Sequence, residues 1–248
     1  PPRSTPLYSS AASDVYKRQI QCPHTYAVRL SLTNYVRRYI EEVQSERGLP
    51  DASVVSEAVL TEARSTCGGL LFVANWVNAA CSVDVSELCG HFLHFTYEHV
   101  RRLNKLVRYA HRLAGEPLVL NPLRGDVEVL VYGDAAFQNM NKSRSQGGAV
   151  AMLRDQTTGT VAMISHYLRR VKRVARSTFA AELLNQATSH DLGVFVRRLM
   201  EWVWGLPTRL HARTDCDSLC SYVHSLRTHP REKTLNAEID WFRPPPEC

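Results

Sequence analysis

The chain has 248 residues, a length that fits one large domain or two smaller ones. Hydrophobic residues make up 44% and charged residues 22%, close to the average for globular proteins, which excludes wholesale disorder and a coiled coil. Thirty Lys and Arg against 24 Asp and Glu give a net charge of +6, a mild bias towards a polyanionic partner. No window approaches the roughly 18 uncharged apolar residues of a membrane helix, so we expect no membrane partner.

The two ends of the chain differ in character from the rest. Residues 1–19 are rich in Pro, Ser and Ala and have no hydrophobic period, which predicts disorder. Residues 14–19 (DVYKRQ) resemble the translation of a sequencing-library adapter, so we expect 1–19 to be non-native; an ordinary basic tail is the alternative. Residues 244–248 (PPPEC) interrupt a helical pattern, and we interpret them as the truncated tail of a longer reading frame.

Residues 20–122 show apolar periodicity of helical type. It predicts helices over 35–43, 51–64, 65–76, 82–92 and 97–113. Ser65 is expected to cap the third of these. The sequence therefore predicts an all-helical first half.

Residues 123–243 change to the period of strands. Strands are predicted at 127–131, 147–153, 161–167 and 210–214, and helices at 177–204 and 218–226. Residues 157–159 (TTG) predict a hairpin turn between the second and third strands. Three antiparallel strands, a helix, a parallel strand and a helix make an α/β domain with a mixed sheet.

Three acidic residues are candidates for a metal site. Asp134 follows the first strand, Asp215 ends the fourth, and Glu182 lies among small and apolar residues of the long helix. If these carboxylates meet, their repulsion requires divalent cations, and hard oxygen ligands suit Mg²⁺ or Mn²⁺. Two such ions about 4 Å apart can promote phosphodiester hydrolysis. Spacing alone leaves open that each acid is a separate surface or capping residue.

Four short motifs in the second half carry a family resemblance. They are residues 131–137 (VYGDAAF), 145–148 (SQGG), 177–182 (STFAAE) and 214–219 (TDCDSL). In this order the motifs resemble the ribonuclease H domain of copia-type retrotransposon polyproteins, with SQGG as a small-residue turn into the second strand. The resemblance implies that Asp134, Glu182 and Asp215 bind two Mg²⁺ or Mn²⁺ ions, Asp134 holding both. It also implies cleavage of the RNA strand of an RNA–DNA hybrid.

The first half agrees with this resemblance. Residues 64–74 (RSTCGGLLFVA) and 108–110 (RYA) resemble segments that lie between polymerase and ribonuclease H in these elements. Residues 20–122 are therefore expected to be the C-terminal connection region of a reverse transcriptase, with the remainder of the polyprotein as partner. The family's Tyr-x-Asp-Asp polymerase motif is absent, so this chain is not expected to copy nucleic acid itself.

The fourth acidic residue of the family has no clear equivalent. Its segment follows a fifth strand, and the chain stops before it. Glu238 fits the spacing better than Asp240 and is the candidate fourth catalytic acid. Two other interpretations stay open: a degenerate, non-catalytic remnant that at most binds nucleic acid, and a ribonuclease H-like DNA strand-transferase.

Basic residues gather near the predicted carboxylate site. Those between the third strand and the long helix are Arg169, Arg170, Lys172, Arg173 and Arg176, and Lys142 and Arg144 follow the first strand. Such a patch would hold a phosphate backbone, giving sequence-independent, salt-sensitive binding. The alternative is a solvated loop of like charges.

The cysteines bear on the cellular compartment and on a possible zinc site. Seven cysteines form no regular framework and no secretory signal is present, which favours a reducing intracellular compartment. His211, Cys216, Cys220 and His224 would bind zinc only if all four converged. Buried cysteines on an apolar helix face explain the same pattern.

Overall fold

The computed structural model describes residues 18–44, 50–140, 144–205, 207–224, 235, 238, 239 and 242. The chain divides into two compact units, residues 1–122 and 123–248, and each is described by itself. Residues 1–17 and 243–248 lie outside the described residues, and so do the predictions made for them. The disorder predicted for residues 1–19 is wrong at Arg18 and Gln19, which lie in a strand. None of the described helices has the length and apolar character needed to cross a membrane.

The described residues of the first unit form four α-helices. They are α2 (Thr33–Tyr39), α3 (Glu57–Trp76), α4 (Ser82–Gly90) and α5 (Tyr97–Leu113), with short 3-10 turns at Ala79–Cys81 and Phe92–His94. The two helices predicted across 51–76 are wrong, because α3 runs through Ser65 without a break. The cap is Ser56, whose Oγ accepts a hydrogen bond from the backbone N–H of Val59 at 3.4 Å.

A small antiparallel sheet in the first unit corrects the all-helical prediction. Its strands are β1 (Arg18–Gln21), β2 (Val28–Ser31) and β3 (Leu118–Leu120), in the order β1-β2-β3. Strands of three or four residues contain too few alternations to be recognised in a sequence.

The core of the first unit forms where α3 and α5 present apolar residues at helical spacing. Cys67 and Leu70 of α3 and Leu103 and Val107 of α5 are buried in one cluster. Ile40 follows α2 in extended conformation, so the helix predicted to run to residue 43 ends at Tyr39.

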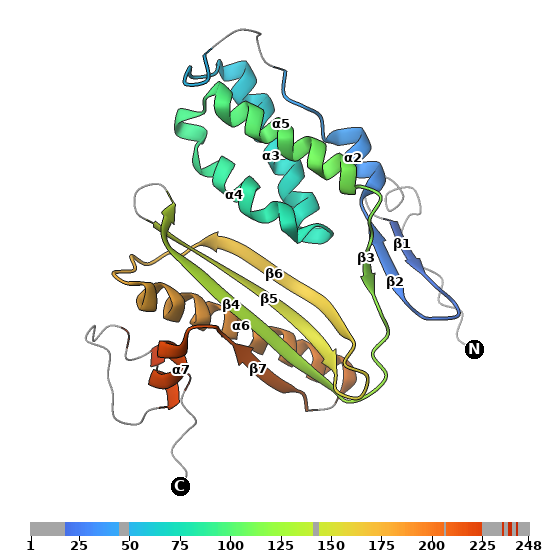
Figure 1. The fold of residues 1–248 in the computed structure, drawn as a ribbon. Coiled ribbons are helices and arrows are strands. Elements are labelled where there is room, and N and C mark those ends of the chain that lie inside the picture. The colour runs from blue at the N-terminus through green and yellow to red at the C-terminus, as the bar shows by residue number, and fades with distance from the viewer. Residues whose placement is uncertain are drawn as a thin grey trace. The chain divides into compact units, whose positions relative to one another are not determined.

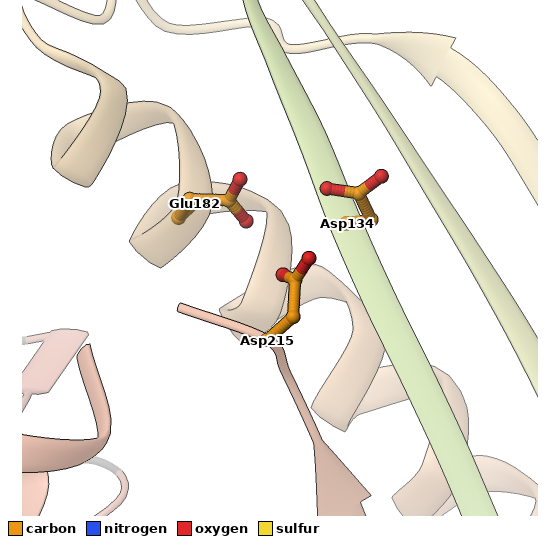
Figure 2. A group of neighbouring side chains, drawn as sticks. All are labelled: Asp134, Glu182 and Asp215. Atoms are coloured by element: carbon orange, nitrogen blue, oxygen red, sulfur yellow. The ribbon is translucent and has the colours of Figure 1, made fainter. Parts of the chain in front are cut away.

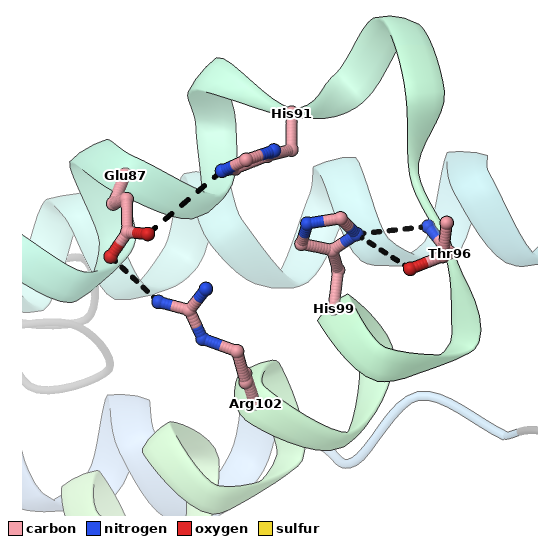
Figure 3. A network of polar contacts seen from close by, with 5 residues as sticks. All are labelled: Glu87, His91, Thr96, His99 and Arg102. Carbon is pink, nitrogen blue, oxygen red and sulfur yellow. Dashed lines mark hydrogen bonds and ion pairs between the residues drawn. The ribbon is translucent and has the colours of Figure 1, made fainter. Parts of the chain in front are cut away.

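Polar contacts join α4 to α5 (Figure 3). Glu87 Oε2 accepts from Arg102 Nη2 at 2.6 Å, and its Oε1 lies 3.9 Å from His91 Nε2. At the start of α5 the backbone N–H of Thr96 donates to His99 Nδ1 at 3.0 Å. The hydrogen bond from Arg102 lowers the pKa of Glu87, and burial lowers the pKa of His99. The bond between Thr96 and His99 caps the N-terminus of α5, and the bond between Glu87 and Arg102 links α5 to α4.

The second unit is a mixed sheet covered by a long helix (Figure 1). Its elements are β4 (Val127–Met140), β5 (Arg144–Asp155), β6 (Val161–Arg170), α6 (Thr178–Trp204), β7 (Arg209–Arg213) and α7 (Asp217–His224). The strand order is β6-β5-β4-β7; β4, β5 and β6 are antiparallel, and β7 is parallel to β4. The predicted mixed α/β fold class, with three antiparallel strands, one parallel strand and helices packed on the sheet, is confirmed.

Alternate residues of the strands pack on α6. Val129 and Val131 of β4 and Ala151 of β5 share a buried cluster with Val196 of α6. Gly193 permits a close helix–sheet approach, since a Cβ there would lie 2.7 Å from the side chains of Leu210 and Val131. This packing sets the height of α6 above the sheet.

We expect Asp155→Ala to lower the melting temperature of the second unit more than Asp126→Ala, a change of an exposed neighbour. The Asp155 carboxylate accepts four backbone hydrogen bonds, from Arg124 (2.7 Å), Gly125 (2.9 Å), Thr157 (2.8 Å) and Thr158 (3.0 Å). They hold the pKa of Asp155 well below its usual value. The stabilisation is therefore present above the unfolded pKa and is lost on acidification, and the variant should lose part of that acid sensitivity. Thermal denaturation at neutral and acid pH checks this; equal melting of the two variants would contradict it.

Candidate metal centre

Asp134 and Asp215 are brought together by the parallel pairing of β4 and β7. The last paired residues are Tyr132 and Arg213, and each aspartate lies two residues further along its own strand direction. The sequence predicted that the strand ends before Asp134, and this is wrong. Strand β4 continues antiparallel to β5 and pairs Asp134 with Gly148. Since β7 stops at Arg213, the β7-facing edge of β4 is open at Asp134.

A local turn directs Asp215 after β7. The backbone N–H of Cys216 donates to Thr214 Oγ1 at 3.2 Å, which closes a short turn around Asp215. Helix α7 then begins at Asp217. The Asp215 side chain is exposed.

Glu182 comes from the second turn of α6. Ser177 caps this helix by accepting a hydrogen bond from the N–H of Ala180 at 3.1 Å. Glu182 is buried, with 7% of its surface exposed, and its Oε1 accepts from the N–H of Ala135 at a long 3.4 Å. The helix therefore presents Glu182 to the β4 residue that follows Asp134.

The three carboxylates converge (Figure 2). One oxygen from each of Asp134, Glu182 and Asp215 lies within 4.8 Å of the other two. Burial, followed by the charge of Asp134, raises the pKa of Glu182 to about 7; Asp215 adds to the effect. The cluster is closed on the helix side and open to solvent at its two aspartates.

The donor set fits a hard divalent cation. All three groups supply carboxylate oxygens, the ligands that Mg²⁺ and Mn²⁺ prefer over softer metals. The raised pKa of Glu182 reflects burial and, after it, repulsion by the aspartates, and a cation at this position would offset both. Asp134, Glu182 and Asp215 are therefore the residues that could hold such an ion.

Glu238 is not part of this cluster. Its Oε1 forms an ion pair with Nη1 of Arg173, in the connection before α6. Asp240, the other residue weighed for this role, lies outside the described residues.

The predicted basic residues lie at one end of the sheet. Arg169 and Arg170 are the last residues of β6, not part of a loop, and Lys172, Arg173 and Arg176 follow in the connection to α6; all five are exposed. Arg144 is exposed at the start of β5, while Lys142 lies outside the described residues. A cavity of about 370 Å³ opens between this segment and α6, where Asn185 and Thr188 line it. Asn185 is one helical turn from Glu182.

The four candidate zinc ligands do not form a site. Among the described residues, the three carboxylates are the group of His, Cys, Asp and Glu side chains that could hold a metal ion. His211 instead contacts Glu128, its Nε2 lying 3.1 Å from Oε2. Cys220 is exposed on α7, so the interpretation as buried cysteines also fails at this position.

Glu128 is a buried acid that sequence reasoning did not single out. It lies in β4 and contacts Arg154 and, at 3.1 Å, Gln156 Nε2 as well as His211. The sequence signal was an acidic residue inside an apolar strand. These partners account for its burial, so it is structural.

Comparisons with known proteins show a distant structural likeness. No protein-family model matches the chain, and no curated protein sequence matches it. A solved structure of the foamy viral protease-reverse transcriptase dRH in complex with ds DNA aligns at 14% identity with a TM-score of 0.47. The alignment covers 90% of this chain and 36% of that one, so the chain spans about a third of its length. A likeness at this level assigns no function.

Proposed function

We propose that the chain is the ribonuclease H region of a copia-type retroelement polyprotein, acting inside the cell on the RNA strand of an RNA–DNA hybrid. The observation that carries the proposal is the convergence of Asp134, Glu182 and Asp215 from three separate elements. The motifs around these residues, in family order, support the choice of hydrolysis over strand transfer.

Each carboxylate has a distinct position in the proposed reaction. Asp134 would hold both divalent ions, and Glu182 and Asp215 would each hold one. When bound, the two ions activate a water and stabilise the leaving oxygen in phosphodiester hydrolysis. Glu182 must be ionised to serve as a ligand, so its pKa of about 7 favours metal binding at neutral to alkaline pH. The exposed aspartates leave the solvent side open to a substrate.

The basic residues at the end of β6 supply the backbone contacts. Their exposure and the cavity beside them suit a phosphate backbone, which would be recognised by shape and charge rather than by base. Arg173 already pairs with Glu238, so Arg170 and Lys172 are the better test of this role.

Replacing both Arg170 and Lys172 with alanine is expected to weaken hybrid binding uniformly across sequences. Loss of two phosphate contacts should make the plot of log affinity against log salt shallower by about 2. Fluorescence anisotropy with a labelled hybrid in EDTA, over a series of salt concentrations, measures both effects. Arg209→Ala, an exposed cation at the start of β7, is the control and should keep the wild-type slope. An unchanged slope in the double variant would mean that these residues are a solvated surface.

The proposed activity is tested with the purified 248-residue chain. An end-labelled RNA is presented in a hybrid, as a single strand and as an RNA duplex, with Mg²⁺, with Mn²⁺ and with EDTA. We expect cleavage of the hybrid alone and only with a divalent cation. Binding of the hybrid without cleavage in any of these conditions would reject the enzymatic proposal.

That outcome would support the second candidate function, a nucleic-acid-binding remnant without catalysis. The position of Glu238 favours this candidate, because its ion pair with Arg173 leaves three acids in the cluster among the described residues, where the family has four. The two candidates share the basic surface and differ only in hydrolysis.

A further inference from the structure

The face of α6 that carries Glu182 is polar where it packs on the sheet. Glu182, Asn185, Gln186 and Ser189 follow one another at helical spacing, and none is more than 7% exposed. Helices that cover a sheet ordinarily bury apolar residues, and α6 does so further along, at Val196. A polar buried stretch confined to the level of the carboxylate cluster calls for a specific role.

Glycines in the facing strands make room for these side chains. A Cβ on Gly147 would lie 2.1 Å from Asn185 Oδ1, and one on Gly133 would lie 2.6 Å from Gln186 Oε1. Gly133 directly precedes Asp134, and Gly147 directly precedes the residue that pairs with it. The glycines at positions 133 and 147 thus leave the space that the side chains of Gln186 and Asn185 occupy.

The Asn185 amide joins the helix to three strands. Its Nδ2 donates to the carbonyl oxygens of Asp134 at 2.8 Å and of Gly148 at 2.9 Å, and its Oδ1 accepts from the hydroxyl of Tyr167 at 3.1 Å. Two carbonyl acceptors on one side require the NH₂ group there, which fixes the orientation of the amide. Both amide hydrogens therefore bond to the main chain of one cross-strand pair, Asp134 and Gly148.

The hydrogen bonds of Asn185 lie beside the carboxylate cluster. Asn185 lies three residues after Glu182, one helical turn along α6. The other bond from α6 to this part of β4, from the N–H of Ala135 to Glu182, is long at 3.4 Å and correspondingly weak. Repulsion between Glu182 and the two aspartates would tend to separate α6 from β4, and Asn185 opposes that separation.

We propose that Asn185 is a positioning residue of the carboxylate cluster. It holds the main chain of Asp134 at a fixed distance from the helix turn that carries Glu182, so that the two carboxylates can share a divalent cation. The inference rests on the proposed function, because it assumes that the cluster binds metal. It assigns to Asn185 an effect on metal affinity beyond its contribution to stability.

The test is a titration of purified full-length variants with Mn²⁺ alone, followed by calorimetry or by the EPR signal of free Mn²⁺. Asn185→Ala is expected to lower Mn²⁺ affinity about 10- to 100-fold, the range for loss of a group that orients metal ligands. Tyr167→Phe is the matched control, since it removes the bond to Oδ1 and leaves both donations to Asp134 and Gly148. It should lose stability and keep the wild-type affinity. Denaturant unfolding of each variant without metal defines conditions in which all are folded.

The outcomes separate the inference from the proposed function. Equal affinity losses in Asn185→Ala and Tyr167→Phe, or no loss in the former, would reduce Asn185 to a structural role. Asn185→Ser, which can retain one donated hydrogen bond, is measured alongside and replaces the alanine variant if that one does not fold; an intermediate loss is expected, and wild-type affinity would overturn the inference. Asp134→Asn must abolish the Mn²⁺ signal. If it does not, the metal centre itself is wrong, whatever Asn185 does.

Discussion

Replacing Asp134 with asparagine is expected to abolish metal-dependent cleavage of the RNA strand. The change preserves the size and the backbone pairing of the residue with Gly148, so the sheet should remain intact. It removes the charge of the carboxylate that would contact both ions. We expect a loss of activity of at least roughly 10²- to 10³-fold, the effect typical of deleting one group that stabilises transition-state charge.

The assay compares single-turnover cleavage of a hybrid by the wild type and the variant at saturating Mg²⁺. Asp217→Asn is the matched control, because Asp217 is an exposed acid two residues from Asp215 that lies outside the cluster. It should retain wild-type cleavage. Retained cleavage in Asp134→Asn would overturn the assignment, whereas losses of equal size in both variants would point to a general effect of charge near the substrate.

The three carboxylates could be identified from the sequence because residue type and order carry most of the information. Asp134 follows an apolar strand, Asp215 ends the fourth predicted strand, Glu182 lies among small and apolar residues, and the family resemblance selects all three. Their meeting could not be predicted in the same way. It depends on the parallel register of β4 with β7, which pairs residues far apart in the chain and leaves no local pattern.

The length of β4 shows where local reasoning fails. The strand was expected to end near Asp134, because the apolar run at 127–131 gives way there to Gly133 and Asp134. It continues to Met140 because β5 pairs with it over that length, with a register shift between Ala136 and Met140 and a positive φ of 50° at Gln138. The residues SQGG, expected to form a turn, lie inside β5. Gly147 is better explained by the space that Asn185 needs.

Asn185 itself left no signal in the sequence. Its partners are two main-chain carbonyls and a tyrosine hydroxyl, and carbonyls belong to every residue type. Only the strand pairing that places Asp134 opposite Gly148 makes one side chain able to reach both. The contacts of Asn185 can therefore be recognised only once the fold is known, whereas the acidic residues stand out in the sequence itself.

The pKa of Glu182 leads to the prediction with the largest effect on stability. In the folded chain without metal this pKa is about 7, against an ordinary value of 4.5. The folded state therefore binds this proton more tightly than the unfolded state does. Stability is highest below the unfolded pKa and falls as the pH rises from about 4.5 to about 7, where the buried carboxylate becomes charged.

Glu182→Gln should consequently stabilise the metal-free protein at pH 8 by about 1–3 kcal/mol, allowing for solvent screening of the full shift. The glutamine Oε1 can still accept the hydrogen bond from Ala135, and no charge faces Asp134. Urea unfolding in EDTA at several pH values measures the gain. Asp191→Asn, an exposed acid on the same helix, is the control and should not reproduce it.

Divalent cations should reverse this order of stability. Mn²⁺ bound to the native state stabilises it in proportion to the logarithm of its concentration above the dissociation constant. The wild type should gain this stabilisation, and Glu182→Gln should gain little, because it lacks one of the three proposed ligands. A wild type that is less stable than the variant in EDTA and more stable in Mn²⁺ would show that a charged Glu182 buried beside the two aspartates is unfavourable without metal and is offset by the cation. If the variant is less stable in EDTA at pH 8, the carboxylates do not repel one another as described, and the argument for a cation at this position loses its electrostatic basis.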